Sequence, residues 1–374
     1  MNLKLIVALF TILQFFGCAS NKCILPAING LSKDVQVTEF QKEAIYNCAK
    51  LFPNETQISL GLISDTSVKF VGSIRKNDTI KDVDNYKKIF EIGSITKVLN
   101  SSILSNLILL GKVKPDENIT DIIALKLKGN PKITIEQLAN HTAGLERNPP
   151  DIKSDYPNKS YPENLYSDEK LLNYLSNKLK LQNEPGTKMS YSNTGAQVLG
   201  YILCKFENTD FETLLQQNIF SRFKMTSSTT NKNKIQNLLI PGLDKDGNVC
   251  SHWPWKTYLY AGSGTFSNVE DLSKFAIAEC DTNNYDLRFA QNKTFHIADS
   301  VFQNSTADIG LDWIILNRKS GEKWIWHNGA TDGYYSHIII NVQKRKAVVM
   351  LSNISSTNTQ RRTTLSGLSE AKAA

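Results

Sequence analysis

Strand-like segments lie near both ends of this chain, and helix-like segments fill its middle. Apolar, β-branched runs at 57–63 and 68–75 predict a hairpin, because the turn-forming residues Ser64-Asp65-Thr66 join them. Further strands rich in Trp, Tyr, Ile and Val are predicted after residue 255, at 258–266, 310–316, 323–327, 334–341 and 347–352. Helical spacing and capping residues predict helices at 39–51, 134–140, 168–181, 194–206 and 211–220. We therefore expect an α+β fold, with one antiparallel sheet built from both chain ends, flanking helices, and a mainly helical insertion over about 115–250.

Two stretches carry no clear periodicity and are expected to be loops. Residues 76–86 are highly charged, and residues 146–167 contain four prolines. A structureless stretch as long as the second one is usually functional or disordered, so we interpret it as a loop over a cleft.

The first residues have the pattern of a secretory signal. Lys4 is followed by an apolar run that is too short to span a membrane as a stable helix, and the run ends at Gly17-Cys18. This end resembles a bacterial lipoprotein processing site, where Cys18 would be lipidated. We expect a signal peptide at 1–17, a lipidated N-terminus and tether at 18–37, one domain at 38–354 and a polar tail at 355–374. The mature protein is then expected on the periplasmic side of a bacterial cell envelope, anchored to a membrane by the N-terminal lipid.

Charge and cysteine spacing narrow the range of partners. The chain of 374 residues has a formal net charge of +7, without a run of basic residues, and we find no nucleic-acid signature. Its six cysteines and five histidines show no metal-ligand spacing, so we expect neither a metal nor another cofactor. No obligate protein partner is evident from the sequence.

Ser94 and Lys97 begin the most informative stretch, a long apolar segment that runs to residue 110. If this segment is a helix, the hydroxyl and the amine lie at i and i+3 on one face. A serine hydroxyl needs a base to become a nucleophile, and a lysine with a lowered pKa can supply it. The alternative is a helix cap followed by a solvated lysine.

Tyr191 and Asn193 form a second candidate pair, because side chains two apart in an extended segment point to the same side. A nearby lysine ammonium would favour the tyrosine phenolate, so that Tyr191 could exchange a proton with a serine or a leaving group. Asn193 offers both a donor and an acceptor to a substrate amide. The alternative is a core tyrosine and a capping asparagine.

A third candidate group ends the strand predicted at 323–327. Gly329 allows close approach of another backbone or a ligand, and the Ala330 N–H could bind an oxyanion together with that of Ser94. His327 could line the site as a hydrogen-bond donor, or it could be an ordinary strand histidine.

These three groups, in this order, resemble the motifs of the serine beta-lactamase and penicillin-binding-protein-like family. The resemblance is to its branch of class C beta-lactamases, D-Ala-D-Ala carboxypeptidases and esterases. Ser94 to Lys97 matches Ser-x-x-Lys, Tyr191 to Asn193 matches Tyr-x-Asn, and His327 to Gly329 takes the place of Lys-Thr-Gly or His-x-Gly. Segments 141–145, 261–265 and 348–353 give supporting matches.

The resemblance implies a beta-lactamase/transpeptidase-like fold and a serine hydrolase. Ser94 would be acylated, Lys97 and Tyr191 would move its proton, and Asn193 and the strand at residue 327 would hold a small-molecule or peptidoglycan-derived peptide substrate. Beta-lactamases of this branch usually carry lysine at the position of His327, where it helps to hold the substrate carboxylate.

Two alternatives to a beta-lactamase or carboxypeptidase remain open at this point. One is an esterase with a wide apolar cleft, which Trp253, Trp255 and Tyr258 could line. The other is a non-catalytic protein that binds penicillin or a cell-wall fragment. Ser263, between two glycines, is the competing serine.

Overall fold

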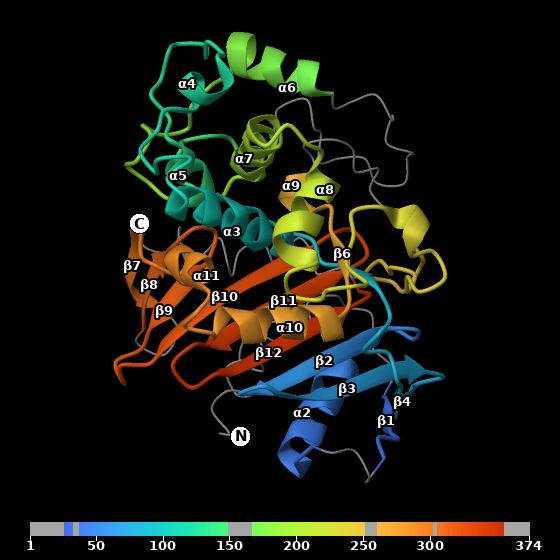
Figure 1. The fold of residues 1–374 in the computed structure, drawn as a ribbon. Helices are drawn as coiled ribbons and strands as arrows, with labels where there is room; N and C mark the ends of the chain where they lie inside the picture. The colour runs from blue at the N-terminus through green and yellow to red at the C-terminus, as the bar shows by residue number, and fades with distance from the viewer. Residues whose placement is uncertain (1–25, 33–36, 149–166, 251–259, 302–304, 355–374) are drawn as a thin grey trace.

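The computed structural model describes residues 26–32, 37–148, 167–250, 260–301 and 305–354. A ten-stranded sheet, in the order β1-β4-β3-β2-β12-β11-β10-β9-β8-β7, crosses the molecule (Figure 1). Its strands are β1 (Ile28–Asn29), β2 (Gln57–Ser64), β3 (Ser67–Lys76), β4 (Thr79–Asp82), β7 (Phe295–Val301), β8 (Ser305–Ile309), β9 (Ile314–Asn317), β10 (Lys323–Ala330), β11 (Tyr335–Asn341) and β12 (Lys346–Ser352). The two ends of the chain meet where β12 pairs antiparallel with β2, with Val349 opposite Gly61. The α+β fold with a sheet made from both ends is therefore confirmed.

The sheet also corrects several of our expectations. The charged segment 76–86 contains β4, because Asn77 and Asp78 take left-handed conformations, with φ of 49° and 52°, and so form a tight hairpin turn. Part of the segment expected as a tether also joins the sheet, since β1 pairs parallel with β4. The strand predicted at 310–316 begins only at Ile314, and β7 and β8, before it, were not predicted at all.

The strand predicted at 258–266 is wrong in its described part. Residues 260–263 form the short helix α9 (Tyr260–Ser263), and only β6 (Phe266–Ser267) is extended, pairing with β5 (Phe90–Glu91). The lack of a side chain at Gly200 of α7 (Asn193–Phe206) allows that helix to pack closely on α9, because a Cβ on Gly200 would lie 2.1 Å from that of Ala261. Tertiary packing thus overrides the local strand preference of this segment.

Helices cover both faces of the sheet (Figure 1). On one face, α2 (Glu39–Ala49) packs through Ile45 and Cys48 against strand residues such as Leu60 and Met350. On the other face lie α3 (Ile95–Leu109), α10 (Val269–Glu279) and α11 (Tyr285–Ala290), whose apolar side chains join the larger core. The last two helices were not predicted.

The helical insertion packs beyond α3, which therefore lies between it and the sheet (Figure 1). It contains α4 (Ile119–Ile123), α5 (Ile135–Ala139), α6 (Asp168–Asn173), η1 (Tyr174–Lys178), α7, α8 (Phe211–Leu215), η2 (Gln216–Phe220) and η3 (Lys232–Lys234). The capping box predicted at Thr134 and Gln137 is present. The helices predicted at 168–181 and 211–220 both change to π-helical geometry partway along, and the first ends at Lys178.

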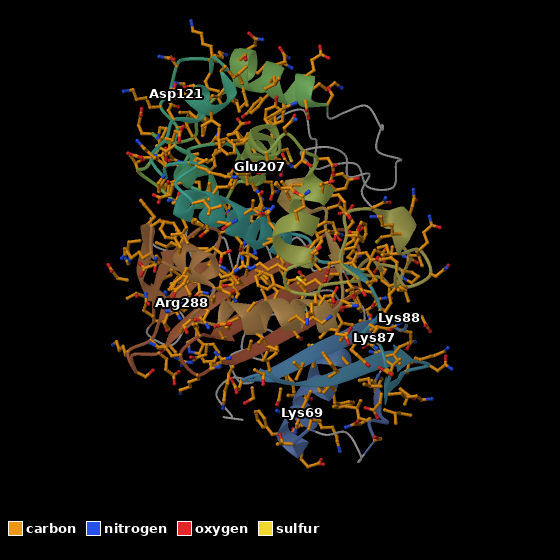
Figure 2. The ribbon with its side chains drawn as sticks, viewed as in Figure 1. Lys69, Lys87, Lys88, Asp121, Glu207 and Arg288 are labelled. Atoms are coloured by element: carbon orange, nitrogen blue, oxygen red, sulfur yellow. The ribbon has the colours of Figure 1, made fainter. Side chains whose placement is uncertain are left out.

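Charged side chains occur over the surface of both parts of the molecule, while α3 lies in its interior. Figure 2 labels six charged residues, among them Lys69, Asp121 and Arg288, which are spread over both the helical part and the sheet part. By contrast, α3 is buried over most of its circumference, as expected for a helix that is apolar on several faces. In the part of the chain that the structure describes, no helix has the length and apolar character needed to cross a membrane.

Candidate active site

Ser94 stands at the N-terminus of α3, directly after β5 and a tight turn at Gly93, whose φ is +51°. Its hydroxyl makes no capping bond to the helix, and its side chain is only partly buried. Lys97, one turn later, is fully buried. The arrangement differs from a serine cap followed by a solvated lysine, because the hydroxyl faces accessible space and the amine lies behind it.

The Lys97 amine has three close partners. Its Nζ lies 3.0 Å from Ser94 Oγ, 2.8 Å from Asn193 Oδ1 and 2.5 Å from the carbonyl oxygen of Gly262. The amide and carbonyl oxygens can only accept, so a neutral amine donates its two hydrogens to them. Its lone pair then faces the third partner, the serine hydroxyl, which can donate.

The electrostatics of the site favour this neutral form. Burial lowers the pKa of Lys97 from 10.5 to about 7, the Asp312 carboxylate opposes that shift, and the Arg147 guanidinium adds to it. A lysine with this pKa is a competent general base at neutral pH.

Tyr191 reaches the same centre, but its ionisation differs from our expectation. Its hydroxyl interacts with the Ser94 side chain, and its ring centroid lies 5.0 Å from Lys97 Nζ. Burial nevertheless raises the pKa of Tyr191 well above its usual value. The expectation of a favoured phenolate is therefore wrong, and the hydroxyl remains a proton donor near neutral pH.

Both polar groups of the Asn193 side chain form hydrogen bonds to other residues of the protein. Its Oδ1 accepts from Lys97, and its Nδ2 donates to Asn148 Oδ1 at 2.7 Å. In this structure Asn193 thus holds the base in place, whereas we expected both of its groups to face a substrate amide.

The backbone around Gly329 fits an oxyanion site. A Cβ at Gly329 would lie 2.0 Å from the Ile92 carbonyl oxygen and 2.7 Å from Ser94 N, so only glycine permits this approach. The Thr331 N–H points towards the side of β11, where it donates to the Tyr334 carbonyl oxygen. Because successive N–H groups of a strand point to opposite sides, the Ala330 N–H points away from β11. A Cβ at Gly93 would lie 2.7 Å from Ala330 N. The backbone N–H groups of Ser94 and Ala330 thus lie close together beside the Ser94 side chain, where they could bind an oxyanion.

His327 lies at the edge of this group, with its ring centroid 6.1 Å from that of Tyr191. Burial lowers the pKa of His327 to about 3, so the imidazole is neutral. Its Nδ1 lies 2.8 Å from the Asn328 carbonyl oxygen, which can only accept, and therefore Nδ1 carries the hydrogen. Nε2 is then an acceptor, which corrects the expected donor role.

His141 belongs to the supporting segment 141–145, but the sequence did not indicate that it forms the polar support behind Tyr191. The His141 ring centroid lies 4.4 Å from that of Tyr191, and His141 Nδ1 accepts from Ser192 N–H at 3.3 Å. Its Nε2 therefore carries the hydrogen and lies 3.1 Å from Asp312 Oδ1. Asp312 is fully buried and also accepts from the Ser101 hydroxyl of α3. Its left-handed conformation, with φ of +58°, is not visible in the sequence.

Ser263, the competing serine, lies inside the site. Its Oγ is 3.5 Å from Ser94 Oγ and donates to the Gly262 carbonyl at 2.5 Å. The Lys97 amine is hydrogen-bonded to Ser94 Oγ and to the Gly262 carbonyl rather than to Ser263 Oγ, so Ser94 is the better nucleophile. The loop expected over the cleft, the aromatic residues at 253, 255 and 258, and Cys18 lie outside the described residues, apart from the ends of the loop.

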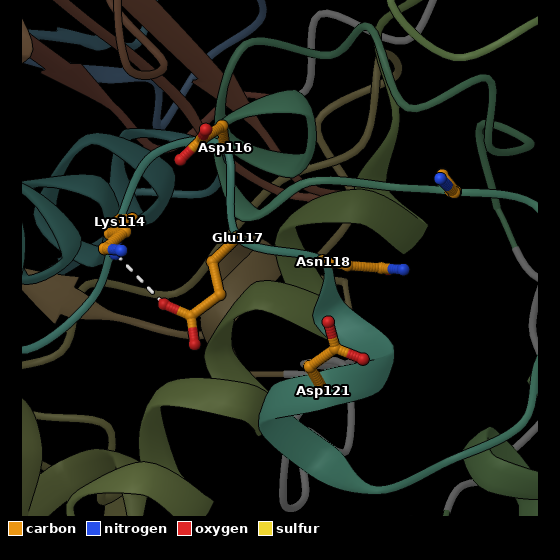
Figure 3. A pocket seen from close by; sticks show the side chains of 6 residues that line it. Lys114, Asp116, Glu117, Asn118 and Asp121 are labelled. Carbon is orange, nitrogen blue, oxygen red and sulfur yellow. Dashed lines mark hydrogen bonds between the residues drawn. The ribbon is translucent and has the colours of Figure 1, made fainter.

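A surface hollow (Figure 3) is formed mainly by residues of the segment that follows the C-terminal end of α3. Ser94 stands at the other end of that helix. It is lined by Lys114, Asp116, Glu117, Asn118, Asp121 and Lys132. These side chains include no serine or cysteine nucleophile. Among the described residues, no group of histidine, cysteine and acidic side chains is arranged to hold a metal ion.

Comparison with known proteins gives consistent matches. The family model described as Beta-lactamase matches residues 73–371. The chain is 27% identical over 297 residues to Beta-lactamase-like protein 4 of Dictyostelium discoideum, covering 71% of this chain and 50% of that protein. It is 22% identical over 325 residues to a putative D-alanyl-D-alanine carboxypeptidase of Escherichia coli O157:H7, covering 76% and 73%. The match thus spans only half the length of the first of these relatives.

Two solved structures are similar in fold. The D-alanine carboxypeptidase AmpC from Burkholderia cenocepacia superposes with a TM-score of 0.69 at 20% identity, covering 87% of this chain and 96% of that one. A class C beta-lactamase gives a TM-score of 0.66 at 17% identity, covering 85% and 91%. At these identities the two structures establish the beta-lactamase/transpeptidase-like fold.

Proposed function

The chain belongs to the beta-lactamase family, and from this premise we propose that it is a serine hydrolase that forms an acyl-enzyme on Ser94. The observation that carries the proposal is the contact of 3.0 Å between Ser94 Oγ and the buried amine of Lys97. Because the pKa of Lys97 is lowered to about 7, much of the amine is neutral near neutral pH, and the neutral amine can accept the serine proton as the oxygen attacks.

The remaining groups of the site fit the other steps of acyl transfer. As Ser94 Oγ bonds to the substrate carbonyl carbon, the carbonyl oxygen gains negative charge, which the Ser94 and Ala330 N–H groups stabilise. Tyr191 donates its hydroxyl proton to the leaving group when the tetrahedral intermediate collapses, and it recovers a proton from the lysine ammonium. Water then cleaves the ester by the same sequence of proton transfers.

We propose a beta-lactam or a D-Ala-D-Ala type peptide as the substrate class, since structural neighbours of the chain are named for a D-alanine carboxypeptidase and a class C beta-lactamase. An ester is the second candidate. The neutral His327 favours it, because this side chain supplies no charge for a substrate carboxylate.

Kinetics with matched substrates separate these functions. We expect steady turnover of a penicillin, a D-Ala-D-Ala peptide or an activated ester, and the ratio of their kcat/KM values ranks the classes. A single burst of product equal to the protein concentration, without turnover, would instead identify a penicillin-binding protein that does not act as an enzyme.

We also propose export and lipid anchoring through Cys18, on the basis of the apolar run that ends there. In the native host, the Cys18→Ala variant should leave the membrane fraction, while its activity stays unchanged. A mature protein whose mass still includes Met1 would contradict export.

A further inference from the structure

Arg147 is held beside the catalytic tyrosine by its own backbone. The Arg147 carbonyl oxygen accepts from Asn193 N at 2.8 Å and Thr194 N at 3.3 Å, at the start of α7. The guanidinium carbon lies 5.0 Å from the centroid of the Tyr191 ring, and the side chain is exposed. A cation is therefore positioned at the accessible edge of the site, although the sequence offered no motif for it.

The other basic groups of the site are unsuited to bind a substrate anion. Lys97 is fully buried, and its three contacts are taken within the protein. His327 is buried and presents an acceptor nitrogen. An arginine keeps its charge at all relevant pH values, and its planar guanidinium matches a carboxylate with two parallel hydrogen bonds.

We infer that Arg147 binds the carboxylate of the substrate that acylates Ser94, so that this chain recognises the anion from the Tyr191 side of the cleft. The inference rests on the proposed function. In the described part of the chain, no carboxylate forms an ion pair with the Arg147 guanidinium, and its contact there is the face of the Tyr191 ring. None of the described carboxylates therefore competes with an incoming anion for the N–H donors of Arg147.

A purely structural role makes a different prediction. If Arg147 only packs on Tyr191, or only adjusts the charge near Lys97, its loss slows acylation by charged and neutral substrates to the same degree. If it binds the carboxylate, the loss falls on the charged substrate alone. A pair of substrates that differ only in that carboxylate therefore separates the two roles.

The test uses a penicillin and its methyl ester, and it measures the second-order rate constant of Ser94 acylation for each. We expect the Arg147→Met variant, which keeps the length of the side chain, to lower the acid-to-ester ratio about tenfold to a hundredfold. The Arg147→Lys variant should recover part of the ratio. The Lys188→Met variant removes an exposed cation three residues before Tyr191, and it should leave the ratio unchanged.

An unchanged ratio in Arg147→Met, with both rate constants reduced together, would overturn the inference and leave the serine mechanism intact. If neither compound acylates the parent protein and a fluorophosphonate does not phosphonylate it, the proposed function itself is wrong, and the inference falls with it.

Discussion

The lowered pKa of Lys97 predicts how acylation depends on pH. Only the neutral amine can take the Ser94 proton, so the acylation rate should rise with pH and level off above about 7. At pH 6 about a tenth of the molecules carry the neutral amine, and at pH 8 about nine tenths do. With the ordinary lysine value of 10.5, only ~1 molecule in 3,000 would carry it at pH 7.

A neutral activated ester is the right probe, because its own charge does not change over the range from about pH 5 to about pH 9. Single-turnover acylation should give one rising limb with a midpoint near the Lys97 value. The pKa of Tyr191 is raised, so this side chain should add no falling limb near neutral pH.

Two charge variants should move this limb in opposite directions. The Asp312 carboxylate raises the pKa of Lys97, so Asp312→Asn should shift the midpoint to lower pH. The Arg147 guanidinium lowers the pKa of Lys97, so Arg147→Met should shift the midpoint to higher pH. A rate that is flat across the range, or one that still rises tenfold per unit at pH 9, would refute Lys97 as a base tuned by burial.

Three further changes have defined outcomes. Gly329→Ala places a methyl group against Ser94 N, so kcat for a neutral ester should fall about a hundredfold to a thousandfold, and unaltered kcat would argue against this oxyanion site. In the parent, the pKa of Lys97 is lower in the folded state than in the unfolded state, so between pH 7 and 10.5 the unfolded chain binds one more proton than the folded chain. Lys97→Met removes this group and its effect on stability. The free energy of unfolding of the parent should therefore gain about 2 kcal/mol over that of Lys97→Met from pH 7 to 9, which denaturant titrations at both pH values can measure. His327→Lys should raise the ratio of penicillin to neutral-ester hydrolysis about tenfold or more. If the parent and the variant give the same ratio, residue 327 does not contact the carboxylate.

The sequence was most informative where local pattern and tertiary structure agree. The hairpin at 57–75, the helix after Ser94 and the last three strands were predicted, because each has strong periodicity and clear turn residues. The three candidate motifs were also placed at a helix start, an extended segment and a strand end, where the structure brings them together. Their spacing alone could not give the distances between them.

The parts that were missed depend on contacts distant in sequence. The strand β7 and helix α10 are defined by their packing on the sheet, and α9 is helical in a segment of strand-like composition. Burial reversed the expected ionisation of Tyr191 and gave His327 an acceptor nitrogen, because desolvation depends on the whole fold. Asp312 and Arg147 were missed because no motif marks them and only the folded chain brings them to the site.

The most direct test of a serine acyl-enzyme at Ser94 is intact mass followed by peptide mapping after exposure to a penicillin, a fluorophosphonate and an activated ester. We expect the parent and the Ser263→Ala variant to gain one adduct per chain, mapped to Ser94, and we expect a folded Ser94→Ala variant to gain none. An adduct on Ser263, or a Ser94→Ala protein that is still labelled and still turns over substrate, would contradict the mechanism.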